Sequence, residues 1–220
     1  MAGEARVSRV DLESRRTGYI VRGGWTKADL WRTTLLGGQP AVIKDFGSKR
    51  WPVRLWGRIQ IAREARSLEA LADLGVAPRL LDRVDALALA VESLEGSSLY
   101  LHPAGPAARP HLAALRHAMA RVHACGIVHN DLRGRENVLL VEPGPRIVVL
   151  DWAGAVQLRP GGWLFRLWKK VDDSALLKWT EMLDPESLSA EDREFLRRFR
   201  RWRRLWPFNR KGLGWTRMES

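Results

Sequence analysis

Two carboxylates and one amide flank a short apolar hairpin in the second half of the sequence. Asp131 and Asn137 precede its first expected strand, residues 138–141, and Asp151 follows its second, residues 147–150. Because a hairpin returns the chain to the end at which it began, both carboxylates should lie at the same end. Hard oxygen ligands in that arrangement suit Mg²⁺, which takes one or two carboxylates together with substrate phosphates. A lone Asp after a strand is usually a cap or turn residue, but three candidates in this order favour a metal site.

A lysine and a glutamate in the first half of the sequence could serve the same chemistry. Lys44 ends the apolar strand at 41–43, and Glu64 follows 20 residues later on an expected helix. Side chains in such places usually point to solvent. Paired with each other, the carboxylate would instead hold the ammonium in position for phosphate oxygens.

The elements that must position these residues form a strand-rich first half and a helix-rich second half. In the first half, apolar periodicity and glycine or proline turns predict a hairpin at 30–44, a helix at 57–74 and strands at 79–84 and 87–92. In the second half they predict helices at 111–124, 171–183 and 189–206. This arrangement is typical of an α+β chain with two lobes, and the hinge should lie near Glu92 to Gly96.

The candidate residues lie in motifs that resemble those of protein kinases. Segment 41–44 (AVIK) is similar to the strand-lysine motif, 123–132 (HACGIVHNDL) to the approach to the catalytic loop, and 150–153 (LDWA) to the metal-binding segment, normally Asp-Phe-Gly. Segment 91–99 (VESLEGSSL) is similar to the hinge that receives adenine. The resemblance covers roughly residues 20–180. The short chain resembles most the bacterial branch that contains RIO-type kinases and lipopolysaccharide core (Kdo/heptose) sugar kinases.

The resemblance implies a protein-kinase-like fold that uses ATP, with the nucleotide between the lobes. Lys44 would hold the α- and β-phosphates, and Glu64 would pair with Lys44. Asp131 would accept or orient the proton of the attacking hydroxyl. Of the two histidines nearby, His129 would brace the loop and His123 would be a buried, hydrogen-bonded helix residue.

The same resemblance implies a metal site and an adenine site. Asn137 and Asp151 would hold Mg²⁺. Glu92 and Leu94 would offer backbone groups to adenine. It also divides the chain into a loose polar leader at 1–16, an N-lobe at 17–94 with five strands and one helix, and a C-lobe at 95–220.

Several features depart from the protein-kinase pattern. Gly23-Gly24-Trp25-Thr26-Lys27 stands where a Gly-rich phosphate cover would be, and Asn137 lies one residue further from Asp131 than is typical. Trp152-Ala153 replaces Phe-Gly, and no Ala-Pro-Glu follows. These departures argue against a peptide substrate and leave a nucleotide-binding pseudokinase scaffold as an alternative.

The amino-acid composition indicates which partners and which cellular compartment to expect. The 220 residues carry a net charge of +12 and contain eleven Trp, which favours a phosphate-bearing partner: nucleotide, nucleic acid or anionic lipid. The single cysteine excludes a disulfide within the chain, and no apolar run is long enough to span a bilayer. A cytoplasmic protein is therefore expected.

The basic, Trp-rich C-terminal helix has three interpretations. Residues 193–220 carry a net charge of +8, and an aromatic stripe falls at helical spacing on Phe195, Phe199, Trp202 and Trp206. The stripe could pack on the C-lobe, or it could bind anionic lipid, with residues 163–170 as a second patch of the same kind. Nucleic-acid binding ranks third, because no known reading motif accompanies the charge.

Together these observations predict ATP- and Mg²⁺-dependent phosphorylation of a hydroxyl group. The expected acceptor is a lipopolysaccharide core sugar or another lipid-linked sugar, at the inner face of the cytoplasmic membrane. The alternative enzyme is a RIO-type serine/threonine protein kinase.

Overall fold

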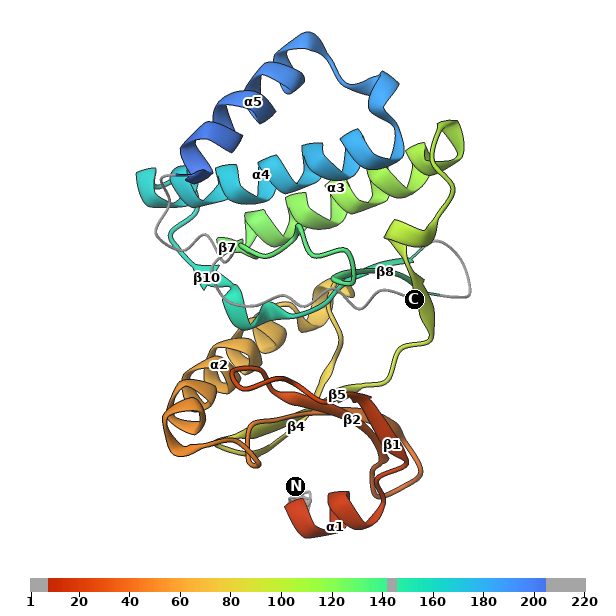
Figure 1. Ribbon diagram of the computed structural model, residues 1–220, viewed down its shortest axis with the longest axis vertical. Coiled ribbons are helices and arrows are strands. Elements are labelled where there is room, and N and C mark those ends of the chain that lie inside the picture. The colour runs from red at the N-terminus through yellow and green to blue at the C-terminus, as the bar shows by residue number, and fades with distance from the viewer. Residues whose placement is uncertain (1–7, 142–145, 205–220) are drawn as a thin grey trace.

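The first half of the chain forms a five-stranded antiparallel sheet in the order β1-β2-β3-β5-β4. The computed structural model describes residues 8–141 and 146–204 (Figure 1). The strands are β1 (Gly18–Val21), β2 (Asp29–Thr34), β3 (Pro40–Asp45), β4 (Leu80–Asp85) and β5 (Ala88–Glu92). The predicted hairpin is confirmed as β2 and β3, which pair from Asp29 opposite Asp45 to Thr34 opposite Pro40. Its turn needs positive φ at Gly37 and Gly38, which glycine adopts without strain.

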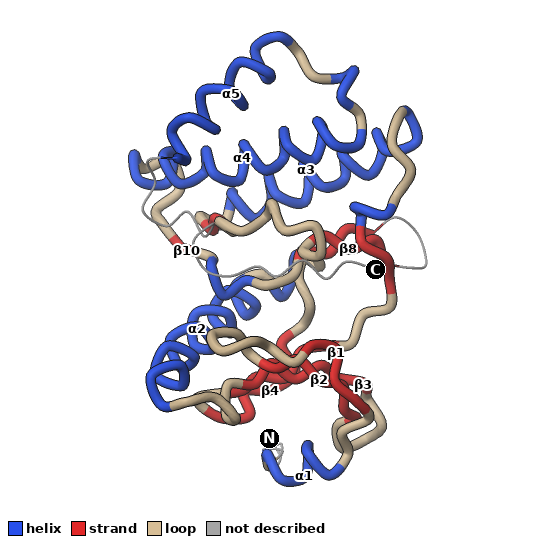
Figure 2. The backbone as a smooth tube through the Cα atoms, viewed as in Figure 1, coloured by secondary structure: helices blue, strands red, loops and turns tan. Residues whose placement is uncertain are grey.

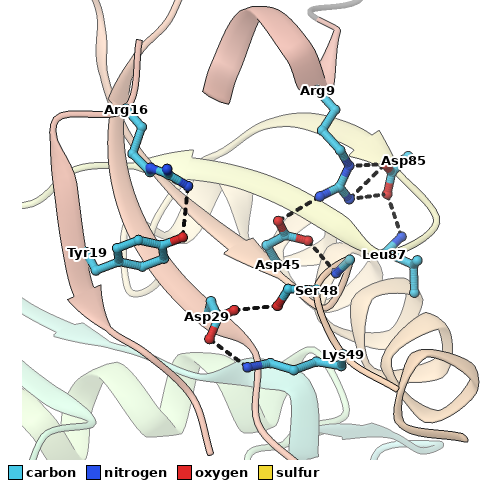
Figure 3. Close-up of polar contacts among 10 residues, drawn as sticks. Arg9, Arg16, Tyr19, Asp29, Asp45, Ser48, Lys49, Asp85 and Leu87 are labelled. Atoms are coloured by element: carbon cyan, nitrogen blue, oxygen red, sulfur yellow. Dashed lines mark hydrogen bonds and ion pairs between the residues drawn. The ribbon is translucent and has the colours of Figure 1, made fainter. Parts of the chain in front are cut away.

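A short helix packs against this sheet where the sequence suggested a loose leader. Helix α1 (Arg9–Ser14) buries Leu12 against the sheet. The Arg9 guanidinium bridges two carboxylates, Asp45 at 2.6 Å and Asp85 at 2.8 Å (Figure 3). The leader prediction is therefore wrong from residue 9 onward, because the polar residues at this end find partners on the sheet.

Helix α2 (Trp51–Ala70) runs beside the sheet and begins before the predicted start at residue 57. Pro52 suits the first turn of a helix, where its missing N–H costs nothing. The inward face is set by residues at helical spacing, and Gly57 lets Phe46 approach closely. The buried residues of this face are Gly57, Ile61, Glu64, Ala65 and Leu68.

The second half of the chain is mostly helical. The helices α3 (Arg109–Ala124), α4 (Trp163–Leu183) and α5 (Ala190–Arg204) lie next to one another at the top of Figure 1. Below them lie small sheets made of β6 (Gly96–Ser98), β8 (Val138–Val141) and β9 (Arg146–Val149), and of β7 (Ile127–Val128) and β10 (Val156–Gln157). The predicted helices are confirmed, except that α4 starts at 163 rather than 171.

The two halves are joined by a segment without regular structure at residues 93–95. Figure 2 shows the strand-rich part below and the helix-rich part above, with this connection between them. The two-lobed α+β arrangement predicted from the sequence is therefore confirmed. Within the described residues, no helix combines the length and apolarity needed to cross a bilayer.

The C-terminal helix packs on the C-lobe over the part whose side chains are described. On α5, Leu196 and Phe199 are buried, and the Phe195 and Phe199 rings stack with centroids 5.8 Å apart. This part of the aromatic stripe follows the packing interpretation. The Trp202 side chain and Trp206 lie outside the described part of the chain.

Candidate active site

Three predicted site residues from three distant segments meet at one ammonium group. The Lys44 Nζ lies 2.6 Å from the Glu64 Oε2 and 2.8 Å from the Asp151 Oδ1. Strand β3 supplies the lysine, α2 supplies the glutamate, and the end of β9 leads to the aspartate. The Glu64 side chain is only 7% exposed, whereas that of Asp151 is 46% exposed. The open side of the cluster is therefore the side of Asp151.

The charges in this cluster support one another. Burial disfavours the charged form of Lys44, but the Glu64 and Asp151 carboxylates outweigh burial and raise the pKa of the ammonium. Burial also raises the pKa of Glu64, with a contribution from the charge of Asp151, although Lys44 acts to lower it. The lysine is thus a permanent cation at the edge of the site, held where phosphate oxygens could reach it.

The longer loop between Asp131 and Asn137 closes on itself. The Asn137 Nδ2 donates to the Asp131 carbonyl at 2.8 Å, and the Leu150 N–H donates to the Asn137 carbonyl at 2.8 Å. Gly134 makes this possible, because a Cβ there would lie 2.6 Å from the Asn137 Nδ2. The structure therefore places Asn137 between the segment of Asp131 and the segment of Asp151, despite the extra residue in the loop.

The donor set at this point suits a hard cation. The Asn137 amide nitrogen is engaged by the loop, which fixes the orientation of its Oδ1, and the Asp151 carboxylate is partly exposed. An amide oxygen and a carboxylate are the ligand types that Mg²⁺ takes beside phosphates and water. These residues fit the predicted metal.

Two residues of the candidate site have an unusual backbone conformation. Among the described residues, the non-glycine positions with positive φ are Asn130, at 68°, and Asp151, at 60°. This left-handed conformation is uncommon for residues other than glycine, although Asn and Asp adopt it more readily than the others. Asn130 directly precedes Asp131 of the predicted catalytic loop, and Asp151 is itself a predicted metal ligand, so both residues belong to the candidate site.

A buried carboxylate that the sequence interpretation missed holds the predicted catalytic loop. Asp172 of α4 accepts the His129 N–H at 2.8 Å, the Asn130 N–H at 2.9 Å and a bond from the His123 Nε2 at 3.0 Å. Its side chain is fully buried. The sequence feature that could have revealed Asp172 is its position on the apolar face of the predicted helix at 171–183, on the same side as Trp179 two turns later. Such a residue must have polar partners, and here they are backbone groups of the loop.

Both histidines have the structural roles predicted for them. The His129 Nδ1 accepts the Asp131 N–H at 3.2 Å, so its Nε2 carries the proton and donates to the Leu150 carbonyl at 2.9 Å. His129 thereby joins the segments that carry Asp131 and Asp151. His123 is buried and bonded to Asp172, as expected.

Two tryptophans fix the same segments from the core. Trp152 is fully buried, donates to the Val149 carbonyl at 2.7 Å and lies edge-on to the His129 ring. Trp179 of α4 donates to the Leu132 carbonyl at 2.9 Å. Trp152 therefore acts as a core residue that anchors the segment after Asp151. Arg63 of α2 adds a contact between the lobes, donating to the Ala155 carbonyl at 2.9 Å.

The predicted adenine contacts of Glu92 and Leu94 stay a prediction, but the structure limits which backbone group of Glu92 could make one. The Glu92 N–H donates to the Arg79 carbonyl at 3.0 Å, because Glu92 still belongs to the sheet. Of the two backbone groups of Glu92, the carbonyl is therefore the candidate for a contact with adenine. Leu94 lies beyond the strand, in the irregular segment between the lobes, and its role stays a prediction.

The glycine turn between β1 and β2 lies beside the start of α2. The Lys49 Nζ donates to the Gly23 carbonyl at 2.8 Å and pairs with Asp29 at 2.6 Å (Figure 3). A Cβ at Gly23 would lie 2.1 Å from the Ala28 carbonyl oxygen, so this tight turn requires glycine. The turn is a compact, braced loop.

Comparison with known proteins shows the fold. No family model and no curated protein sequence matches the chain. Among solved structures, the Rio2 kinase from Chaetomium thermophilum in complex with ADP, Mg²⁺ and phosphoaspartate is similar, with a TM-score of 0.61 and 13% identity. The match covers 83% of this chain and 61% of that one, so the chain spans about three-fifths of its length. A second structure of Rio2 kinase from the same organism gives a TM-score of 0.60 at 12% identity, over 87% of this chain and 74% of that one.

The chain therefore has a protein-kinase-like fold, with a β-sheet N-lobe and a helical C-lobe, as the sequence motifs implied. At this level of identity the likeness concerns the fold alone.

Proposed function

We propose that the protein is an ATP- and Mg²⁺-dependent phosphotransferase that acts on a hydroxyl group. One observation carries this proposal: the carboxylates of Glu64 and Asp151 both contact the ammonium of Lys44. The neighbouring loop brings Asn137 toward Asp131. The similar Rio2 structure holds ADP and Mg²⁺, which supports the same pair of ligands for this chain.

Each residue then has a task that its surroundings suit. Lys44, fixed by Glu64, binds phosphate oxygens as a permanent cation. Asp151 and Asn137 would hold Mg²⁺, which when bound neutralises charge on the phosphates. Asp131, with its backbone held by His129 and Asn137, orients the acceptor hydroxyl and takes its proton. Phosphoryl transfer needs little more than such positioning and charge neutralisation.

Positive charge next to the catalytic loop favours an acceptor that itself carries negative charge. Lys178 lies on α4 beside Trp179, which is bonded to Leu132 of the loop. Burial lowers the pKa of Lys178 and the charge of Arg133 lowers it further, whereas Glu181 acts to raise it and Arg200 and Arg135 again lower it. Lys178 thus lies near three arginines and one glutamate, and that glutamate is paired with Arg200. An excess of positive charge of this kind attracts an anionic partner. An acidic or phosphorylated sugar fits this field, and so does an acidic segment of a protein.

The comparisons favour the RIO-type serine/threonine protein kinase over the lipid-linked sugar kinase as the closer model. The similar solved structures are Rio2 kinases, and nothing in the comparisons supports a lipopolysaccharide acceptor. We place the reaction in the cytoplasm because ATP is available there, at the inner face of the membrane if the acceptor is a lipid-linked sugar.

The test uses the full chain with labelled ATP and Mg²⁺. Transfer of label to proteins in a cytosolic extract supports the protein-kinase proposal, and transfer to a membrane lipid extract supports the sugar-kinase proposal. Label on the chain itself that hydroxylamine removes would indicate an aspartyl phosphate, the group held by the similar Rio2 complex. Nucleotide binding without any transfer or hydrolysis would overturn the phosphotransferase proposal in favour of a pseudokinase scaffold.

A further inference from the structure

Helix α2 exposes a row of large apolar side chains on the side away from the active site. Trp51 is 77% exposed, Leu55 58% and Ile59 48%, and these residues recur every four positions. Trp56, at 49%, widens the row. Residues four apart share one face of a helix, and this face lies opposite the one that buries Ile61 and Glu64. We name these four residues the α2 outer face.

The α2 outer face is too apolar to be an ordinary solvated surface. Single exposed apolar residues are common, but a contiguous patch of this kind usually marks an interaction site. Figure 1 shows α2 along the margin of the N-lobe, with no other described element outside it. The helix keeps its site-forming residues inside and presents two tryptophans outside.

The segment that carries the α2 outer face has an excess of positive charge, although Lys49 at its start is paired with Asp29. Residues 46–63 contain five Lys or Arg and no Asp or Glu. Arg54 and Arg58 are exposed on α2 itself. At the helix start, the Arg50 guanidinium lies 4.8 Å from the ring centre of the exposed Trp25. Helices that lie in the interface of an anionic bilayer have an apolar face with Trp at the depth of the headgroups, and Arg or Lys along its border. The α2 outer face has this composition.

We propose that the α2 outer face docks the protein on an anionic lipid surface. Trp51, Leu55 and Ile59 enter the boundary between headgroups and acyl chains, while Arg54 and Arg58 stay at the level of the lipid phosphates. The tryptophan indoles occupy the interfacial position that this side chain favours. The proposal is independent of phosphotransfer, because it concerns a face that carries none of the site residues.

The single cysteine of the chain makes a direct test possible. In a Cys125→Ser background, Leu55→Cys carries an environment-sensitive fluorophore, and the protein is mixed without nucleotide with vesicles of phosphatidylglycerol and phosphatidylcholine. We expect a blue shift and increased intensity on these vesicles, and no change with pure phosphatidylcholine. Leu36→Cys is the matched control: Leu36 is 55% exposed but lies in the turn between β2 and β3, at the far end of the sheet from α2.

A second variant measures the contribution of charge. Arg54→Gln with Arg58→Gln should weaken binding to the anionic vesicles about 30-fold, since each basic residue near such a surface contributes about a factor of five. Neither residue belongs to the active site, so activity toward a soluble acceptor should be unchanged.

Three outcomes would overturn the proposal. The first is no spectral change at Leu55→Cys while the protein as a whole sediments with the vesicles, which would assign lipid binding to another surface. The second is an equal change at Leu36→Cys. The third is a change at Leu55→Cys with an acidic protein or RNA but none with anionic vesicles, which would make the α2 outer face a docking site for a macromolecule. Loss of phosphotransfer in all variants would leave each of these results unaffected.

Discussion

Helices α2 and α4 both contribute to the candidate active site, but they do so through different interactions. Helix α2 contributes Glu64, whose carboxylate pairs with Lys44 in a cluster that opens to solvent at Asp151. Helix α4 contributes Asp172 and Trp179, which are fully buried and bond to backbone groups of the catalytic loop. In the proposed mechanism, the first helix positions the Lys44 ammonium, and the second helix holds the loop that carries Asp131.

Because of this difference, substitutions in the two regions should affect different properties, activity in one and the free energy of unfolding in the other. Substitution of Asp151, on the open side of the lysine cluster, should remove activity at little cost in folding, because the Asp151 side chain is half exposed. Substitutions at the contact of α4 should cost folding free energy, because they leave buried donors without an acceptor. The predictions below test this separation.

The largest expected effect is on activity, at the open side of the cluster. Asp151→Asn should reduce turnover at least about 1000-fold, because the neutral amide is a poor ligand for Mg²⁺. The free energy of unfolding should change little, since the Asp151 side chain is 46% exposed. Steady-state phosphotransfer and urea unfolding measure the two quantities. Normal phosphotransfer by this variant would refute the assignment of Asp151.

The next effect is on stability, at the buried side. Asp172→Asn should lower the free energy of unfolding by about 3 kcal/mol, because an amide cannot accept all three bonds that the carboxylate accepts. The control is the neighbouring Asp173→Asn, which breaks only an exposed pair with Lys169 and should cost less than about 0.5 kcal/mol. Equal unfolding free energies for the two variants would contradict the framing role of α4.

The pH dependence of a Lys44→Met variant tests the coupling within the cluster. Burial and the charge of Asp151 raise the pKa of Glu64, and this variant removes the lysine that opposes them. A carboxyl group whose folded-state pKa is raised contributes stability below its ordinary value of 4.5 and loses it as the pH rises.

The free energy of unfolding of Lys44→Met, relative to the unmodified protein, should therefore fall as the pH rises above about 4.5, by about 1.4 kcal/mol for each unit by which the substitution raises the pKa of Glu64 further. Chemical denaturation at a series of pH values measures this slope. Adding Glu64→Gln should remove it. A slope that persists in the double variant would show that another group is responsible.

The smallest effect is expected in the loop that lies between the two helices. Gly134→Ala would place a Cβ 2.6 Å from the Asn137 Nδ2, and the asparagine side chain must then move. Phosphotransfer should fall about 10-fold through loss of metal affinity, with a stability cost of about 1 kcal/mol. Titration of activity with Mg²⁺ would show a raised requirement. An unchanged Mg²⁺ dependence would mean that Asn137 is not a ligand.

The same two helices show where the sequence interpretation failed. Both begin earlier than predicted, α2 at Trp51 instead of 57 and α4 at Trp163 instead of 171. In each case the missed turns carry exposed Trp and Leu, so their apolar residues do not follow the buried stripe on which the prediction depended. Local periodicity finds a helix only where apolar residues face the core.

The sequence by itself determined the two-lobed α+β architecture, the hairpin that carries Lys44 and the order of Asp131, Asn137 and Asp151 along the chain. Strand alternation, turn glycines and helical spacing are local signals, so they can be read without the fold. The motif resemblance then gave each candidate a role.

Only the tertiary structure decided that Lys44 lies within 2.8 Å of Asp151, that Gly134 lets the longer loop close on Asn137, and that Asp172 holds the loop from a helix 40 residues away. These contacts join residues that are distant in sequence, and no local pattern specifies which buried donor meets which buried acceptor. The packing of whole elements makes that choice, because it fixes which polar groups are removed from water together.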